Sequence, residues 1–423
     1  FDAGGVTHRF VISGRHRGDL ERLKADSQKI CQAHIDLFAD ADAAGVPARA
    51  PFDRYVFQLH VVDEGYGGLE HRASTALICP RNNLPVKGDA TISEGYLELL
   101  GLISHEYFHA WNVKRIKPAA FIPYDTSREN YTRLLWLFEG FTSYYDELML
   151  VRAGLITQGD YLRLISRHLT QLLRTPGRAT QSIAESSFDA WTKYYRQDEN
   201  SPNAIVSYYL KGGLIALLLD LKLRSETEHT LDDVMRGLWR EFGKTGVGVP
   251  EDVFERFERY TGAQLCEFEA DFVKGTREPD WASVFAKFGI EYQQRASINA
   301  GDRGGVASGT QELHLRQLGI VLSESGDARL RYVISDSAAH RAGLCAGDVL
   351  VALDGLRATR PMLAKHLARF SEGDRMAVHY FRQDVLCSTE LSVGRAPLDA
   401  VSLRVIQPMT EIGAFRQQQW LGR

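Results

Sequence analysis

The pattern His105-Glu106-x-x-His109 constrains this chain most, because two histidines four residues apart lie on one face when the backbone is helical. Apolar residues around it recur at three- and four-residue intervals, which predicts a helix over about residues 93–112 with Ser93 as its N-cap. On such a helix both imidazoles can reach one Zn²⁺, and the Glu106 carboxylate can take a proton from metal-bound water. The alternative is a buried amphipathic helix with two incidental histidines.

A catalytic zinc ion takes a third protein ligand and keeps one position open, and Glu139 is the best candidate for that ligand. It lies in the apolar, helix-like run 134–146, where a carboxylate is costly unless it is paired or coordinates a metal. The alternative is a buried ion pair with Arg115. Three polar residues close behind Glu139 could fix an imidazole tautomer: Thr142, Ser143 and Asp146.

Length and composition indicate a globular protein of two or three domains. The 423 residues are 44% hydrophobic and 25% charged, and a formal net charge of -4 gives no electrostatic reason to bind nucleic acid or an anionic membrane. No apolar run is long enough to span a bilayer, and the five cysteines form no Cys-x-x-Cys pair. Because the chain begins with Phe1, we expect a processed product or a fragment, and the compartment stays open.

The order of predicted elements indicates an α+β fold in four parts. Residues 1–90 supply strands, a helix and a substrate loop to the catalytic domain, and residues 91–298 form its helical, zinc-binding lobe. After a glycine-rich linker, residues 306–397 form a small β-rich domain and residues 398–423 a tail. Within the helical lobe, the polar segment 175–203 is predicted to be an irregular pocket wall.

A glycine-rich segment precedes the predicted helix, and its Gly65, Gly67 and Gly68 permit close backbone approach. Beside a catalytic zinc, Glu70 would offer its carboxylate to a substrate ammonium. The alternative is a flexible hairpin loop.

Two adjacent tyrosines, Tyr208 and Tyr209, precede an apolar helix. Either phenol could stabilise the tetrahedral oxyanion that amide hydrolysis over zinc passes through. The alternative is that both rings anchor the helix to the core.

Two segments resemble the zinc signature of the glycyl aminopeptidase family of gluzincin metallopeptidases: His105-Glu106-x-x-His109-x-Trp111-Asn112 and Leu135-Trp136-x-x-Glu139-Gly140-x-Thr142-x-Tyr144-Tyr145. Gly67-Gly68-Leu69-Glu70-His71 is similar to the exopeptidase loop of the related aminopeptidase N family, whose glutamate holds the free amino terminus. Tyr209-x-Lys211-Gly212 matches that relative's catalytic tyrosine motif and favours Tyr209 over Tyr208.

The run from Ser337 to Gly355, which includes Ala342-Gly343-Leu344-x-x-Gly347-Asp348, resembles the core of bacterial PDZ domains. The resemblance implies a thermolysin-like catalytic domain followed by a PDZ domain. The PDZ ligand loop would be Leu318-Gly319-Ile320, which could capture a peptide carboxyl terminus by strand addition. The alternative is a purely structural module.

The resemblance implies a zinc aminopeptidase that removes small residues, glycine or alanine, from peptide amino termini. One Zn²⁺ per chain would be held by His105, His109 and Glu139, with Glu106 as base, Tyr209 at the oxyanion, and a substrate loop that includes Gly68 and Glu70. Family members usually begin with a further β-rich domain, so we expect part of the substrate site to be missing before Phe1 or to come from a partner fragment. The rival interpretations are a PDZ-regulated endopeptidase and a PDZ adaptor whose peptidase domain is secondary or inactive.

Overall fold

A mixed five-stranded sheet forms the amino-terminal part of the computed structural model, which describes residues 1–39 and 49–422. The strands follow the order β1-β2-β3-β5-β4, with bounds β1 (Asp2–Ala3), β2 (Val6–Ser13), β3 (Arg54–Val62), β4 (Gly67–Glu70) and β5 (Ser74–Pro80). Strands β2, β3 and β5 run parallel, and β4 pairs antiparallel to β5 at the sheet edge. The polar connection that leads into β3 lies partly outside the described residues.

Alternation in β3 explains why this segment is a strand buried on one face. Tyr55, Phe57, Leu59 and Val61 are all buried, while Gln58 and His60 between them are exposed. Two helices pack against each other beside the sheet, α1 (Leu20–Leu37) and α2 (Glu94–Phe108), and α2 also contacts β4 and β5. The glycine-rich segment before Glu70 is therefore an edge strand beside α2, and not a loop that hangs free.

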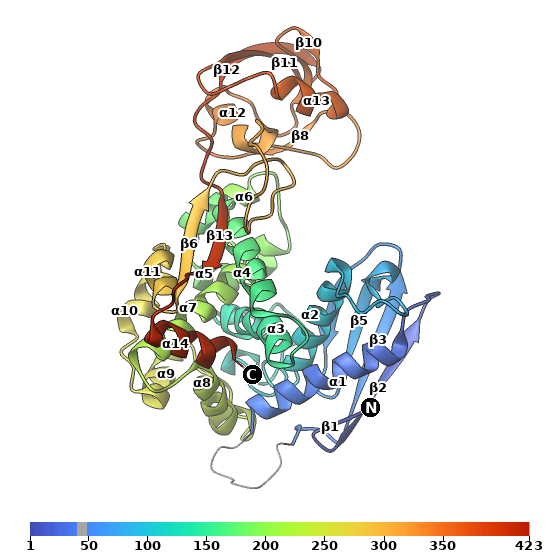
Figure 1. The fold of residues 1–423 in the computed structure, drawn as a ribbon, viewed down its shortest axis with the longest axis vertical. Coiled ribbons are helices and arrows are strands. Elements are labelled where there is room, and N and C mark those ends of the chain that lie inside the picture. Colours follow the sequence, from blue (N-terminus) through green and yellow to red (C-terminus); the bar gives the residue numbers. More distant parts are fainter. Residues whose placement is uncertain (40–48, 423) are drawn as a thin grey trace.

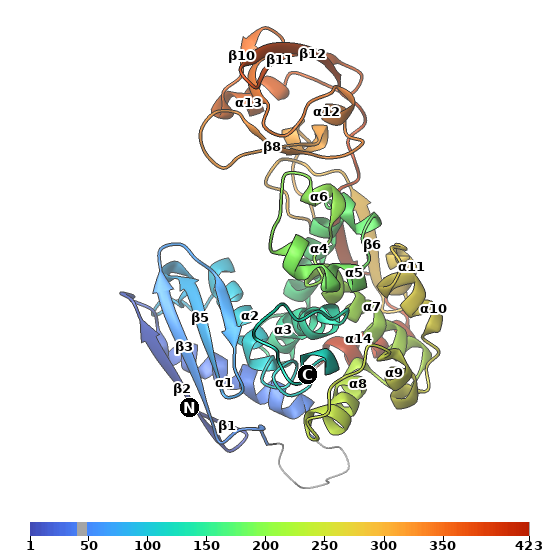
Figure 2. The ribbon, with the colours of Figure 1, turned by 180° about the vertical axis from the view of Figure 1, so that it is seen from behind.

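The middle of the chain is helical, as the periodicity predicts. Its elements include η3 (Trp136–Gly140, a π-helical turn), α3 (Phe141–Arg152), α4 (Gln158–Leu173), α7 (Leu210–Glu226), α8 (Leu231–Leu238), η6 (Trp239–Gly243), α9 (Phe254–Thr261), α10 (Cys266–Phe268), η7 (Glu269–Val273) and α11 (Trp281–Ala286). Figures 1 and 2 show these helices beside the amino-terminal sheet, with α2 at the boundary. Short 3-10 turns lie at η1 (Arg81–Asn83) and η2 (Ala119–Phe121).

The segment 175–203 differs from its prediction, because it is built of short helical pieces and is not irregular. These are η4 (Pro176–Ala179), α5 (Ile183–Phe188), η5 (Ala190–Tyr194) and α6 (Ser201–Ala204). Helix α5 begins with a capping box in which Ser182 and Glu185 satisfy each other's backbone N–H groups. That Ser-x-x-Glu spacing is visible in the sequence and would have predicted the helix start.

A second hydrophobic core lies between Leu318 and Val393, separate from the main one. Its elements are η8 (Leu315–Leu318), β7 (Ile320–Leu322), β8 (Leu330–Val333), α12 (Ala338–Arg341), β9 (Val349–Leu353), β10 (Leu356–Arg357), α13 (Arg360–Leu367), β11 (Arg375–Arg382) and β12 (Val385–Ser392). We call this part the small unit. The Asp354-Gly355 turn joins β9 to β10 as predicted, and both residues have positive φ, at 50° and 75°.

The chain returns from the small unit to the main core, where residues predicted as a tail form β13 (Ala400–Val405) and α14 (Glu411–Leu421). Strand β13 pairs antiparallel with β6 (Ile290–Arg295), and the two strands connect the helical part to the small unit in Figure 1. Asn203 of α6 also joins the two parts. Its Nδ2 donates to the Val333 carbonyl at 2.9 Å, and its Oδ1 accepts from the Ser335 N–H at 2.9 Å.

Among the described residues, no helix combines the length and the apolar character that crossing a membrane requires.

Candidate metal and catalytic site

Helix α2 carries His105 and Glu106, and His109 is its C-cap. The helix begins where the sequence predicts but ends at Phe108, before the predicted end at about residue 112. Ser93 caps it by accepting a hydrogen bond from the Tyr96 N–H at 3.1 Å. The apolar positions of α2 are buried against the sheet and α1, including Tyr96, Leu99, Leu100, Ile103 and Tyr107. This packing turns the face of His105 and His109 toward the helical part.

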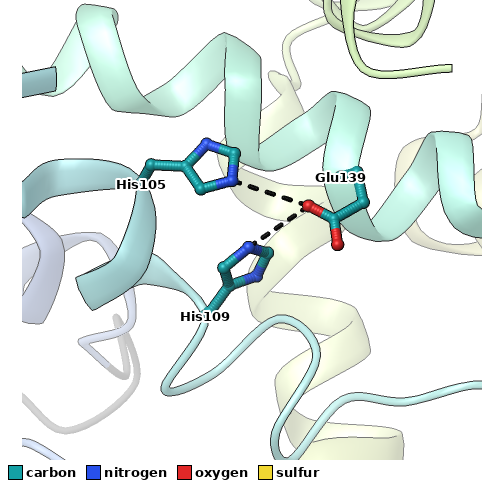
Figure 3. A group of neighbouring side chains, drawn as sticks. All are labelled: His105, His109 and Glu139. Atoms are coloured by element: carbon teal, nitrogen blue, oxygen red, sulfur yellow. Dashed lines mark ion pairs between the residues drawn. The ribbon is translucent and has the colours of Figure 1, made fainter. Parts of the chain in front are cut away.

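His105, His109 and Glu139 converge, as Figure 3 shows. The Glu139 Oε2 lies 3.5 Å from His105 Nε2 and 3.2 Å from His109 Nε2. One ligand atom from each residue falls within 4.8 Å of the others, and the His109 side chain is only 2% exposed. The predicted three-residue cluster is therefore present in the fold.

The outer nitrogen of each histidine is engaged by a neighbour. His109 Nδ1 lies 2.7 Å from the Asn112 carbonyl, which can only accept, so Nδ1 carries the proton. His105 Nδ1 lies 3.1 Å from Asp146 Oδ2, which selects Asp146 from the three polar candidates. In the neutral form that binds a metal ion, both imidazoles would direct their Nε2 lone pairs toward the position beside the Glu139 carboxylate. The donor set fits a divalent metal such as Zn²⁺.

The electrostatics of the cluster also favour a positive charge at its centre. Burial lowers the pKa of His105, but hydrogen bonds and charges from Asp146 and Glu139 outweigh it and raise that pKa to about 10. Burial raises the pKa of Glu139, yet the two histidines outweigh it and hold that pKa well below its usual range. Burial raises the pKa of Asp146 to about 6, against the opposing effect of its His105 hydrogen bond.

Asn112 ties the end of α2 to the turn that carries Glu139. Its Nδ2 donates to the carbonyls of Leu137 and Phe138 in η3, at 3.3 and 3.2 Å. The alternative ion pair for Glu139 does not form, because the Arg115 guanidinium donates to the carbonyls of three other residues: Pro51, Arg72 and Ala110.

Glu106 is buried beside the cluster, with 4% of its surface exposed. Its Oε2 accepts from Thr75 Oγ1 at 3.3 Å, and its Oε1 lies so close to Gly68 that a Cβ there would sit at 2.1 Å. Burial raises the pKa of Glu106, while the neighbouring His109 and His105 oppose that rise. A carboxylate with a raised pKa can both take and return a proton.

Tyr209 lies at the start of α7, with its ring centroid 6.4 Å from that of His105. Close packing of two glycines brings this helix to the Glu139 turn, since a Cβ on Gly140 would meet the Gly212 carbonyl carbon at 2.5 Å. The Tyr209 hydroxyl lies 3.2 Å from that of Tyr195. Tyr208 is 1% exposed and belongs to the core.

Glu70 lies at the end of edge strand β4 and is paired with a residue that the sequence did not single out. Its Oε1 lies 3.2 Å from Lys114 Nζ, and the two side chains are 20% and 25% exposed. A substrate ammonium at Glu70 would compete with, or displace, this lysine. Lys114 follows α2 in the chain, but only the fold places it at β4.

The three residues predicted as a PDZ ligand loop lie in the small unit, away from this cluster. Leu318 ends η8, Gly319 has φ of 81°, and Ile320 starts β7. The Gly319 N–H donates to the Arg316 carbonyl at 2.9 Å, and the Gly319 carbonyl accepts from the Ile334 N–H at 2.8 Å. Gly319 is packed against Ser337, so a Cβ there would clash at 2.1 Å.

Comparison with known proteins finds a matching family model and similar solved structures. A family model described as M61 glycyl aminopeptidase matches residues 98–215. Among solved structures, the crystal structure of an aminopeptidase N family protein from Idiomarina loihiensis is 39% identical with a TM-score of 0.90, and the match covers 100% of this chain and 70% of that one. The HtrA-type protease AlgW with a decapeptide matches 19% of this chain and 29% of its own, at 23% identity and a TM-score of 0.18. Among the curated proteins, none matches.

Proposed function

Because the chain belongs to the M61 glycyl aminopeptidase family and is a peptidase, we propose that it is a zinc-dependent aminopeptidase that releases small amino-terminal residues, glycine or alanine, from peptides. The observation that carries the proposal is the convergence of His105, His109 and Glu139 beside the buried Glu106. Two histidines and one glutamate are a ligand set that catalytic zinc uses in peptidases.

The metal and its ligands have distinct parts in the proposed reaction. When bound, Zn²⁺ would supply a Lewis acid that polarises the scissile carbonyl and lowers the pKa of a water molecule. His105 and His109 would bind it through Nε2, because their Nδ1 atoms are held by Asp146 and the Asn112 carbonyl. Glu139 would supply the third ligand.

Glu106 would act as the general base and then as the general acid. Its carboxylate would accept the proton of the attacking water and pass that proton to the leaving amine. Burial supports this role because it raises the pKa of Glu106 toward the range in which a carboxylate exchanges protons readily. Thr75 and Gly68 would keep the carboxylate in place from the β4–β5 side.

Tyr209 would donate a hydrogen bond from its hydroxyl to the oxyanion that forms on the carbonyl oxygen. Burial and the charge of Glu139 raise its pKa well above the ordinary value, so the hydroxyl keeps its proton for donation. The contact with Tyr195 would orient the phenol before substrate binds.

Glu70 would give the enzyme its exopeptidase character by pairing with the free amino terminus. The unpaired edge of β4 can accept an extended peptide as an added strand, which places the amino terminus at Glu70 and the first peptide bonds beside Gly68. Lys114 would move away when the substrate ammonium takes its place.

The test compares wild type with Glu106→Gln on peptides with free or acetylated amino termini. Wild type should release residues only from the free form, and Glu106→Gln should lose about 10²- to 10⁴-fold in kcat. Zinc content of about one per chain in both proteins, measured by elemental analysis, is the control. Equal hydrolysis of acetylated peptides would favour the endopeptidase, and full activity of Glu106→Gln would refute the mechanism.

We also propose that the small unit is a PDZ domain whose ligand groove lies between β7 and α13. Its four-stranded sheet β10-β9-β11-β12, the β7–β8 pair and the left-handed Gly319 support this assignment. Peptides that end in a free carboxylate should bind the full chain with a Kd that Gly319→Val raises. Equal Kd values for free-acid and amidated peptides would mean that the small unit has a structural role and does not bind a peptide carboxyl terminus.

A further inference from the structure

A cavity of about 720 Å³ lies where the helical part meets the small unit. One wall comes from α4 and the segment around α6, and the opposite wall includes Arg303, Arg316 and Tyr332. In Figure 1, α6 and the end of α4 lie directly beneath the small unit. The volume is in the range of pockets that hold small ligands or the end of a peptide.

A second cavity of about 360 Å³ lies nearer the candidate metal site, and its lining includes Tyr66, Tyr209 and Asp146, the partner of His105. The two cavities share several wall residues: Glu147, His168, Gln171, Tyr194, Ser207 and Leu210. These shared residues place the two cavities next to each other, so that together they extend from Tyr209 to the small unit, and we call the pair the path.

The direction of a bound peptide follows from β4, and this step rests on the proposed function. A peptide with its ammonium at Glu70 that adds to the free edge of β4 runs from Glu70 back toward Gly67. Tyr66 precedes β4 and lines the second cavity. The carboxyl-terminal part of the peptide therefore leaves the metal site along this path.

The far end of the path holds cationic groups whose hydrogen bonds are incomplete. Arg174 Nε pairs with Asp399 Oδ2 at 3.0 Å and Nη1 donates to the Asp302 carbonyl at 2.7 Å, but the buried Nη2 has no partner. The buried Nε of Arg316 also has none, and the side chain of the exposed Arg303 makes no hydrogen bond or ion pair within the described ranges 1–39 and 49–422. A buried N–H without a partner costs free energy that an anion would recover.

Asp399 pairs with Arg174, but among the described residues no carboxylate pairs with Arg303 or Arg316. The Glu98 carboxylate also lines the cavity, where it accepts from Asn83 Nδ2 at 3.4 Å. Arg167 is committed to Glu94, and Glu147 to His168 at 3.0 Å. Burial lowers the pKa of Arg174, and the positive charge of Arg316 adds to that effect against the opposing Asp399. The cavity therefore favours an anionic ligand at its far end.

We propose that Arg174, Arg303 and Arg316 bind the carboxyl-terminal carboxylate of the substrate peptide. Guanidinium groups hold a carboxylate through paired, charge-assisted hydrogen bonds. With the ammonium held at Glu70 and the carboxylate held here, the enzyme measures its substrate from both ends. It is then a peptidase for short peptides with free termini, and it disfavours long chains whose carboxyl terminus lies elsewhere.

The test uses the full chain with zinc and a ladder of peptides from dipeptide to decapeptide, each as the free acid and as the carboxyl-terminal amide. The free acid should have a KM about tenfold lower than its amide at the best length, because the contact stabilises bound substrate and transition state alike. Arg303→Gln combined with Arg316→Gln should raise the KM of the free acid to that of the amide, with little change in kcat.

Two controls keep the test specific. Arg9→Gln removes an exposed arginine of β2 whose side chain makes no hydrogen bond or ion pair in the described part of the chain, and it should leave every KM unchanged. Arg303→Gln alone changes an exposed residue and should fold normally, so it reports part of the effect if the double variant is unstable. An amidated peptide with a glutamate as its last residue distinguishes the terminal carboxylate from a side-chain carboxylate.

The proposal is overturned if wild type shows equal KM values for acids and amides, if the double variant raises both equally, or if the glutamate amide binds as well as the free acid. If no peptide loses its amino-terminal residue, the proposed function fails instead. Calorimetric binding of free-acid and amide peptides to Glu106→Gln, with and without Arg303→Gln and Arg316→Gln, then still tests the arginine site. A lower Kd for the free acid that the arginine changes remove supports the site, and one that they leave intact overturns it.

Discussion

Single hydrogen bonds decide which atoms of the candidate site are available. The Asn112 carbonyl and Asp146 each occupy one imidazole nitrogen and leave the other for a metal. The residue types and the His-Glu-x-x-His spacing are visible in the sequence. The partner of each nitrogen is not, because a backbone carbonyl carries no sequence signal and three side chains near Glu139 were equally plausible.

The absence of a side chain at Gly68 leaves room for the Glu106 carboxylate, the proposed general base. We expect Gly68→Ala to lower kcat/KM by roughly 10²-fold, because the added Cβ would occupy the place of Glu106 Oε1 and displace it. The matched control is Gly67→Ala, where a Cβ meets nothing within 4 Å. Steady-state kinetics on one peptide measures kcat/KM for both variants. An equal loss of kcat/KM in Gly68→Ala and Gly67→Ala would contradict this role of Gly68.

At the scale of elements, helix α2 is held from behind by two buried histidines. His8 of β2 lies 2.8 Å from the Tyr107 hydroxyl through Nε2, and His34 of α1 lies 2.8 Å from Ser104 Oγ. Burial lowers the pKa of His8 from 6.5 to about 4 and that of His34 from 6.5 to about 3. Both imidazoles therefore stay neutral where free histidines charge.

Because of these two histidines, we expect the free energy of unfolding to fall in mild acid. Above pH 6.5 the two histidines are neutral in both the folded and the unfolded chain. Below pH 6.5 they become protonated in the unfolded chain, whereas in the folded chain His8 is protonated only near pH 4 and His34 only near pH 3. The free energy of unfolding should thus fall by a few kcal/mol, on the order of 1.4 per pKa unit, as the pH drops through that window.

Urea unfolding as a function of pH measures this loss. His34→Gln should flatten the slope, whereas His71→Gln, which changes an exposed side chain, should keep the wild-type slope. A wild-type stability that does not change between about pH 6.5 and about pH 4 would contradict the assignment.

At the scale of the whole molecule, the carboxyl-terminal segment packs into the main core, whereas the sequence predicted only a tail. Val401 and Leu403 of β13, with Trp420 and Leu421 of α14, are buried in the main core. Trp420 Nε1 donates to the Tyr144 hydroxyl at 3.1 Å, and Tyr144 in turn donates to Asp220 at 2.5 Å. The segment therefore contacts α3 and α7, the helices that follow Glu139 and Tyr209 of the candidate site.

Trp420→Ala should lower the free energy of unfolding by about 3–5 kcal/mol, because it removes a large side chain that is 1% exposed and leaves a cavity. Phe415→Ala, on the same helix at 64% exposure, should change it by no more than about 0.5 kcal/mol. Chemical denaturation compares them, and similar values for the two would mean that α14 does not pack on the main core.

The sequence by itself determined the α2 helix, the three metal-ligand candidates, the α+β class and the family resemblance, since each depends on residue types and local periodicity. Only the tertiary structure decided the partners of those residues: Asp146 for His105, Lys114 for Glu70, the carboxyl-terminal helix for the core, and the arginines that face the path from Tyr209. These pairs depend on how distant segments pack, and the free energy that selects them is spread over the buried surface of the whole fold. The His-Glu-x-x-His helix is thus predictable from a short stretch of sequence, whereas the two cavities beside it, which we propose as a substrate path, are not.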